Sequence, residues 1–99
     1  MARVVRSVAG FRKELNIGDI FWHMTSLYGV PYEIVGPCTI SAFLMDRRFG
    51  FSMVEYTHSR AGVEVTQEDS IEDLTNQHHG VFLNSADAYE YFQARTGKD

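Results

Sequence analysis

The sequence predicts a mainly β domain with one C-terminal α-helix, an α+β class built on a small antiparallel barrel of about five strands. Apolar stretches that alternate with period two recur about every eight to twelve residues, with turns containing Gly or Pro between them. Helical spacing is clear only in residues 85–96. The chain has 99 residues, of which 44% are hydrophobic and 13% aromatic. This length supports one hydrophobic core, so a single domain over residues 1–99 is expected.

Alternation places the strands. In residues 20–25, Trp22 and Met24 share one face of the predicted strand, and Phe21 and His23 share the other. The same pattern predicts further strands at residues 31–35, 38–45, 51–58, 63–66 and 81–83. Together these strands form the predicted barrel, which spans residues 19–83.

The strand over residues 38–45 is the most apolar of the set. Strict alternation puts Ile40 and Leu44 on one of its faces and Phe43 on the other. Just before it, Gly36-Pro37 is expected to bend the chain and to end the preceding strand.

Two segments lie outside the predicted barrel. Residues 1–15 form an N-terminal arm, which is either flexible or contains one helical turn. Residues 85–96 form an amphipathic helix, which Asn84 or Ser85 caps by accepting an amide of the first turn. The apolar stripe of this helix is expected to cover an open end of the barrel, and it consists of Ala88, Tyr89 and Phe92.

Charge is distributed unevenly along a chain whose net charge is −4. The first 13 residues are basic, whereas residues 55–73 are strongly acidic. Because a polyanion needs a positive field at its docking surface, nucleic acid is disfavoured as a partner. The acidic segment is either a solvated loop or a patch that binds a basic groove on a protein. The acidic residues predicted to contact a partner are Glu64, Glu68, Asp69, Glu72 and Asp73.

Cysteine usage and hydropathy indicate the compartment. The single cysteine, Cys38, excludes an internal disulfide and fits a reducing environment, and its apolar surroundings predict an inert, buried thiol. No apolar run reaches the ~18 residues of a membrane span, and the N-terminus does not resemble a signal peptide. We therefore expect a cytoplasmic protein without a membrane partner.

Catalytic chemistry is not expected. Glu55 and His58 lie on opposite faces of one predicted strand, so they do not form an acid–base pair. His78 and His79 are adjacent and are interpreted as exposed loop residues, whereas His23 is interpreted as a partly buried sheet residue, like His58. No catalytic residue, cofactor or metal site is assigned.

Exposed aromatic rings are the candidate anchors for a partner. Tyr28 and Tyr32 flank a turn, and Tyr91 lies off the apolar stripe of the C-terminal helix. Tyrosine is among the residues that dominate binding hot spots. A competing cluster for nucleic acid lies at a hairpin tip, where guanidinium groups could grip phosphates and a ring could stack on a base; it consists of Arg47, Arg48 and Phe49.

Two runs of residues carry a resemblance to known proteins. The run Gly18-Asp19-Ile20-Phe21-Trp22 and the C-terminal run Val81-Phe82-Leu83-Asn84-Ser85-Ala86-Asp87-Ala88 resemble the small SH3-like barrel proteins of phage and prophage accessory genes. Such proteins are often inhibitors, among them anti-CRISPR proteins, that occlude a surface of a host defence or regulatory complex. The first run is also similar to the start of the MazF and PemK toxin ribonucleases. That family has an Arg-Pro pair, with a catalytic Arg, where this chain has Gly36-Pro37.

These observations predict a non-enzymatic interaction module that inhibits a protein complex of a bacterial host. Exposed rings and the acidic segment would form its contact surface. One alternative is an RNA-binding SH3-like barrel or an atypical toxin ribonuclease. Another is a phage structural component that self-associates, for which a solution mass above one chain is expected.

Overall fold

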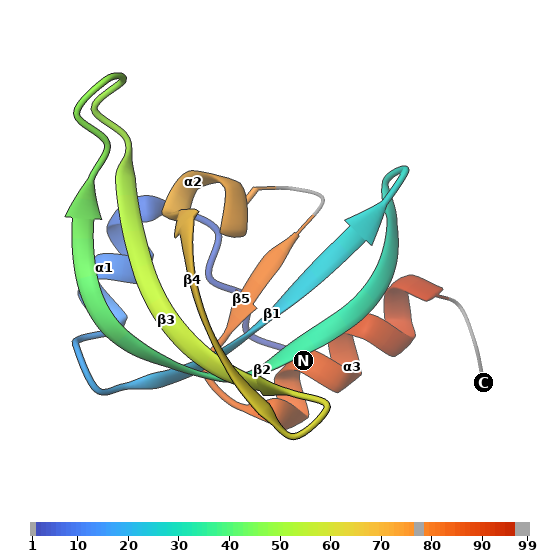
Figure 1. Ribbon diagram of the computed structural model, residues 1–99. Coiled ribbons are helices and arrows are strands. Elements are labelled where there is room, and N and C mark those ends of the chain that lie inside the picture. The colour runs from blue at the N-terminus through green and yellow to red at the C-terminus, as the bar shows by residue number, and fades with distance from the viewer. Residues whose placement is uncertain (1, 77–78, 97–99) are drawn as a thin grey trace.

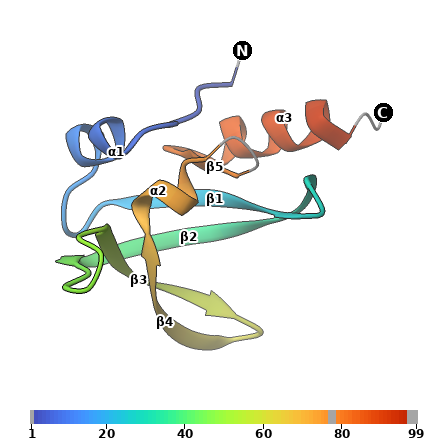
Figure 2. The same ribbon diagram turned by 90° about the horizontal axis from the view of Figure 1, so that it is seen from above.

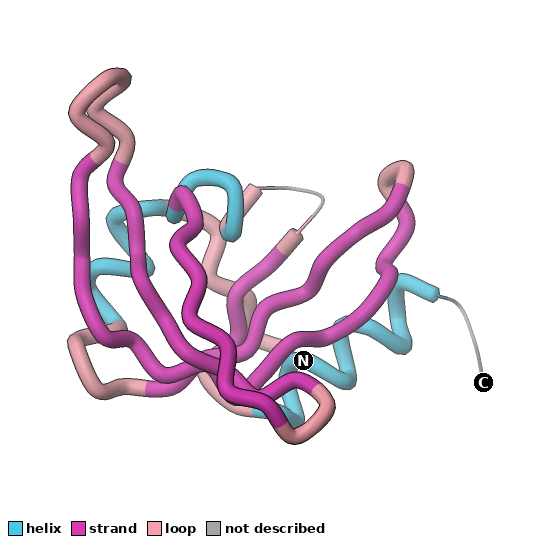
Figure 3. The backbone as a smooth tube through the Cα atoms, in the orientation of Figure 1, coloured by secondary structure: helices cyan, strands magenta, loops and turns pink. Residues whose placement is uncertain are grey.

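The computed structural model describes residues 2–76 and 79–96. Its strands form one antiparallel sheet in the order β4-β3-β2-β1-β5 (Figures 1 and 3). The strands are β1 (Ile20–Leu27), β2 (Val30–Met45), β3 (Ser52–Arg60), β4 (Val63–Ser70) and β5 (Gly80–Phe82). The helices are α1 (Val8–Glu14), α2 (Ile71–Leu74) and α3 (Ser85–Thr96). The predicted mainly β, α+β class with a C-terminal helix is confirmed.

The sheet is open and strongly curved. The long strands β2 and β3 bend so that the sheet wraps around a concave side, and α2 lies over this side (Figures 1 and 2). Strands β4 and β5 form the two edges of the sheet. Closure of these edges into a complete barrel stays a prediction.

Strand β2 corrects the prediction of two separate strands. It is continuous from Val30 to Met45 and passes through Gly36-Pro37, whose peptide bond is cis. Here Trp22 of β1 faces two residues of β2, because Phe21 pairs with Cys38 and His23 pairs with Val35. A side chain on Gly36 would overlap the indole ring of Trp22. Glycine at this point therefore allows the strand to bend without ending.

A second irregularity of β2 corrects the predicted faces of residues 38–45. Ile40 pairs with Tyr56 and Ala42 pairs with Glu55, so Ser41 is an extra, bulged residue. The bulge shifts the alternation by one residue. Phe43 consequently packs against the core, whereas Leu44, predicted to share the face of Ile40, is exposed.

The larger hydrophobic cluster fills the concave side of the sheet. Phe11 of α1 stacks edge-on against Phe21, with ring centroids 5.4 Å apart, and Phe21 stacks in the same way against Tyr56 at 5.3 Å. Ile71 and Leu74 of α2 cover the cluster on the side that faces away from the sheet. These rings have geometries that add to the stability gained from burial alone.

The smaller cluster lies between the opposite face of the sheet and α3. Met24, Phe82 and Ala88 form its buried centre. Tyr91 and Phe92 pack against this centre, so the inner stripe of α3 runs through residues 88, 91 and 92. Tyr89, which was predicted to lie on this stripe, is exposed. Tyr91 and Phe92 follow Ala88 by three and four positions and therefore share its helix face, whereas Tyr89 follows it by one and is turned away.

The N-terminal arm is held against the rest of the molecule. Helix α1 is capped by Ser7, whose hydroxyl accepts a hydrogen bond from the amide of Gly10. The amide of Val5 donates to the carbonyl of Val81 at 2.7 Å, which forms an isolated bridge to the outer edge of β5. Among residues 2–76 and 79–96, no helix has the length and apolar character needed to cross a membrane.

Candidate functional site

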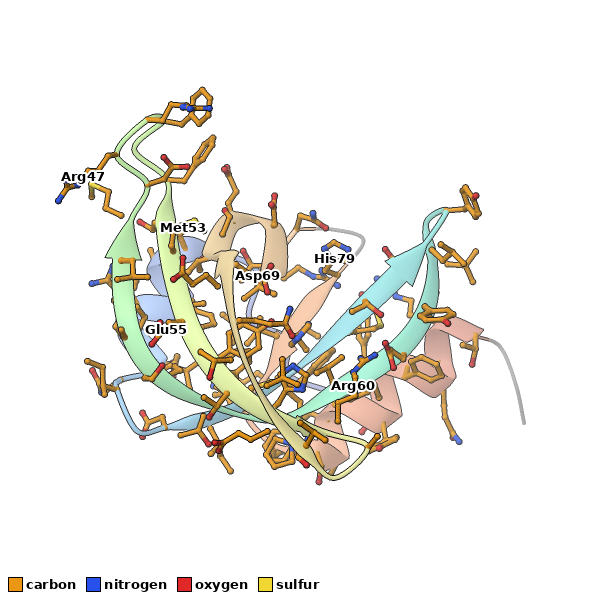
Figure 4. All side chains as sticks on the ribbon, viewed as in Figure 1. Arg47, Met53, Glu55, Arg60, Asp69 and His79 are labelled. Carbon is orange, nitrogen blue, oxygen red and sulfur yellow. The ribbon has the colours of Figure 1, made fainter. Side chains whose placement is uncertain are left out.

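A pocket of about 350 Å³ opens on the concave side of the sheet, between β1, β4 and α2. We call it the β1–β4 pocket. Figure 4 shows Asp69 and His79, two of the residues at this opening. Its lining residues come from four elements and from the segment before β5; they are His23, Met24, Thr25, Tyr56, Gln67, Asp69, Asp73, Leu74, Asn76 and His79.

The floor of the pocket is a chain of polar side chains. Asp69 of β4 pairs with Val54 of β3, which makes Asp69 a diagonal neighbour of Tyr56 on the same face. The Tyr56 hydroxyl donates a hydrogen bond to Asp69 Oδ2 at 2.5 Å. Because its proton is committed to Asp69, the phenol oxygen can only accept from His23 Nε2, which lies 3.4 Å away. A buried imidazole is thus linked through a phenol to a carboxylate.

Burial sets the ionisation of this chain. His23 is only 7% exposed, and desolvation lowers its pKa to about 4, with smaller contributions from His58 and His79. Burial is also the largest cause of the raised pKa of Tyr56, followed by the hydrogen bond to Asp69. At neutral pH the imidazole of His23 is therefore uncharged and the phenol is protonated.

The rim of the pocket is built by α2 and the segment that follows it. The Ser70 hydroxyl accepts a hydrogen bond from the amide of Asp73, which caps α2 at the position where the sequence allowed a helical turn. His79 Nδ1 lies 2.7 Å from the carbonyl oxygen of Asp73. Since a carbonyl only accepts, Nδ1 of His79 carries a proton.

The structure separates the five predicted acidic contact residues. Glu64 and Glu68 point to the convex side of β4, because they alternate with Asp69, which faces the pocket. Glu72 and Asp73 lie on α2, and both are exposed. The acidic residues therefore form an outer group on β4 and a group at or beside the pocket, instead of one continuous patch.

Two of the three predicted aromatic anchors are exposed. Tyr28 is 96% exposed at the tip of the β1–β2 hairpin and has a positive φ of 55°. Tyr32 is the extra residue of a β-bulge between the pairs Thr25–Glu33 and Ser26–Pro31, and it is 62% exposed.

The third predicted anchor, Tyr91, is half-buried, and this corrects the prediction of an exposed ring. Its ring packs against Phe82, with centroids 5.4 Å apart, and its hydroxyl accepts a hydrogen bond from Arg6. Arg95 also lies over the ring, at 4.7 Å. The exposed ring of α3 is that of Tyr89.

The predicted nucleic-acid cluster lies at the tip of the β2–β3 hairpin, in the upper left of Figure 4, where Arg47 is labelled. Arg47, Arg48 and Phe49 are all exposed. The guanidinium carbon of Arg48 lies 5.9 Å from the ring centroid of Phe49, and Phe49 contacts Phe51 with ring centroids 5.8 Å apart. Asp46 caps the turn by accepting from the amide of Arg48.

Three further titratable residues lie on the strand faces that alternation gives them. His58, predicted to be partly buried, is as fully buried as His23, and its Nε2 lies 2.5 Å from Gln67 Oε1. Glu55 faces the other side and accepts a hydrogen bond from Ser41. Cys38 is buried as predicted, and burial raises the pKa of its thiol to about 12.

Metal ligands are not grouped in the part of the chain that the structure describes, which holds no set of three or more His, Cys, Asp or Glu residues suited to an ion. His78 lies outside the described residues. Its neighbour His79, predicted to be an exposed loop residue, is instead half-buried and lines the β1–β4 pocket.

Sequence reasoning missed the convergence of Tyr56 with His23 and Asp69. Alternation in β3 does place Tyr56 on the core face, but it cannot show which strand lies opposite. One signal was available: Asp69 is an odd number of residues from Glu64 and from Glu68, so alternation places it on the opposite face of the strand.

Comparisons of the chain with protein-family models, curated proteins and solved structures find no match.

Proposed function

We propose that this protein is a non-enzymatic interaction module that docks on a protein partner through the tip of its β1–β2 hairpin. The observation that carries the proposal is Tyr28, whose side chain is 96% exposed. The exposed large side chains around it define the hairpin-tip patch: Leu27, Tyr28, Val30 and Tyr32. Exposed apolar groups that gather in one place mark interaction sites, whereas single ones are ordinary.

The hairpin presents the two tyrosine rings in a way that costs little conformational entropy on binding. Leu27 pairs with Val30 across the turn, and the bulge at Tyr32 turns an additional ring outward. A tyrosine has few side-chain torsions to fix on binding and offers both apolar area and a hydroxyl. The two tyrosines of the patch therefore belong to a residue type that is enriched in binding hot spots.

Charge indicates the partner's chemistry. The chain carries a net charge of −4, and Glu64 and Glu68 are exposed on the edge strand β4. A partner with a basic surface around an apolar groove would be steered toward this protein and held by the rings. The resemblance to phage accessory proteins suggests that the partner is a cytoplasmic complex of the host. Docking of this protein would then occlude the working surface of that complex.

The test is capture of partners from a bacterial lysate, followed by affinity measurement with the captured protein. The double variant Tyr28→Ala/Tyr32→Ala is expected to bind at least about tenfold more weakly, because hot-spot rings contribute about 2 kcal/mol or more. Tyr89→Ala is the matched control, since Tyr89 is an exposed tyrosine on α3. Equal affinity of the double variant and the wild type would refute the proposal.

A second candidate function, RNA binding, is favoured by the β2–β3 tip. There the guanidinium of Arg48 lies beside an exposed ring, an arrangement suited to a phosphate and a stacked base. A gel shift with single-stranded RNA that weakens with salt and disappears in Arg47→Ala/Arg48→Ala would support this function. Arg95→Ala is the control for the loss of positive charge elsewhere on the molecule.

A further inference from the structure

We propose that the β1–β4 pocket binds an ammonium or guanidinium group carried on a short aliphatic stem. This site is separate from the hairpin-tip patch and does not depend on the proposed docking function. Its volume of about 350 Å³ lies at the lower end of the range of ligand pockets, about 300 to 1,000 Å³. The pocket therefore has room for a small organic cation or for one basic side chain.

The charge of the lining favours a cation. Asp69 and Asp73 are the ionisable acids of the described lining, and no Lys or Arg lies among these residues. The buried base of the described lining, His23, is uncharged at neutral pH for the reason given above. A negative field in a partly desolvated hollow attracts a cation and repels a phosphate or a carboxylate.

The hydrogen-bonding capacity of the lining also favours a donor. The Tyr56 proton is already used on Asp69 Oδ2, and the proton of His79 Nδ1 is used on the carbonyl of Asp73. Asp69 Oδ1 and the carboxylate of Asp73 remain as acceptors. Ammonium and guanidinium groups are donors without an acceptor, so they match this set.

An organic cation fits better than a metal ion. The described residues contain no set of three or more acidic, histidine or cysteine ligands placed for a metal. The lining also includes Leu74, an apolar side chain that a metal would not use but against which an aliphatic stem can pack.

Arg6 is a basic side chain that contacts two residues of the lining, Asn76 and His79, through their backbone carbonyls. It donates to the carbonyls of Asn76 and His79, at 2.7 and 2.6 Å, and also to the Tyr91 hydroxyl. Arg6 is not itself a lining residue, and its hydrogen bonds hold the segment that carries His79 in place. Arg6 therefore positions the rim and leaves the carboxylates of the pocket to a ligand.

The test is titration of the full chain with N-acetyl-arginine amide, n-butylamine and N-acetyl-citrulline amide, followed by backbone amide NMR shifts and calorimetry. The citrulline derivative has nearly the shape of the arginine derivative but no charge. Saturable shifts at residues 69, 73 and 79 are expected with the two cations, with at least about tenfold weaker binding of the citrulline derivative. An arginine-containing tetrapeptide distinguishes the sources: tighter binding than that of n-butylamine indicates a basic side chain of a protein, and weaker binding indicates a free amine.

Variants distinguish cation binding in the pocket from nonspecific attraction of a cation to acidic side chains. Asp69→Asn and Asp73→Asn are each expected to weaken cation binding about tenfold or more, because each removes a charge from the lining. Glu72→Gln is the matched control, an exposed acid on the same helix that does not line the pocket. Asp73 is exposed, so its variant tests the proposal even if Asp69→Asn fails to fold.

Two results would overturn the assignment. One is the absence of saturable shifts with either cation, and the other is equal weakening by Asp73→Asn and Glu72→Gln. Tyr28→Ala is expected to leave cation binding unchanged, so failure of the hairpin-tip proposal and failure of the pocket proposal are distinguishable.

Discussion

Tyr56 of β3 donates a hydrogen bond of 2.5 Å to the carboxylate of Asp69 on the edge strand β4. The phenol is fully buried, whereas the carboxylate is partly exposed in the β1–β4 pocket. This one contact joins the hydrophobic core to the polar lining of the β1–β4 pocket. It stabilises the edge strand and also fixes the orientation of an acid in the pocket.

Removing the phenol oxygen tests the stabilising part of this role. Tyr56→Phe is expected to lower the free energy of unfolding by about 1–3 kcal/mol, because a partly buried carboxylate loses its donor. Urea denaturation followed by tryptophan fluorescence measures the change. Tyr32→Phe removes an exposed hydroxyl and should alter the stability by less than about 0.5 kcal/mol. Equal stabilities of the two variants would contradict the role given to the Tyr56–Asp69 bond.

Burial of His23 predicts a dependence of stability on pH. The folded state resists protonation of His23 down to about pH 4, whereas the unfolded chain takes up the proton near pH 6.5. The free energy of unfolding should therefore decrease as the pH falls through this window, by roughly 3 kcal/mol in total, and recover above it. Urea midpoints measured between pH 5 and 7.5 test this. His23→Gln should reduce the slope, and an unchanged slope would exclude His23 as its source.

The close approach of Gly36 to Trp22 predicts a specific steric sensitivity. Gly36→Ala is expected to lose at least about 2 kcal/mol, since the new methyl group would overlap the indole ring. Gly62→Ala is the control, because Gly62 also has a positive φ but no atom lies within 4 Å of the position of its added carbon. It should lose only the backbone strain, about 1 kcal/mol. Similar losses in the two variants would show that Trp22 yields to the methyl group.

Substitutions at the N-terminus of α3 test which side chain caps this helix. Asn84 Oδ1 accepts a hydrogen bond of 2.8 Å from the amide of Asp87, and this identifies Asn84, instead of Ser85, as the capping side chain. Asn84→Ala is expected to lower the stability by about 1 kcal/mol, and Ser85→Ala by less than about 0.5 kcal/mol. Thermal melting of both variants would measure the difference, and the reverse order would contradict the assignment.

Sequence patterns predicted those elements whose periodicity is uninterrupted. The alternation of Val54, Tyr56 and His58 matches the buried face of β3, and the helical spacing near the C-terminus matches α3. The extent of α3 was predicted correctly, but its inner face was not, because Tyr91 and not Tyr89 packs inward. The errors in the strands occur where one residue is added to the repeat. The bulge at Ser41 reverses the faces of the second half of β2, and no residue type in that stretch reveals it.

The pocket could not be predicted because it depends on register. Asp69 and Tyr56 are 13 positions apart, and they meet only because β4 pairs with β3 in one particular alignment. A shift of one residue would turn Asp69 to the convex side. Its separation from Glu68 in space, despite their adjacency in the chain, therefore follows from strand pairing and not from composition.

The bridge between Val5 and Val81 has a consequence for aggregation. The N-terminal arm occupies part of the outer edge of β5, so within the described residues β4 is the longer edge whose outer side meets no further strand. Strand-by-strand polymerisation needs two such sides on every copy. Because the arm covers part of the β5 edge, the β4 edge offers the longer free side for edge-to-edge pairing with a second copy.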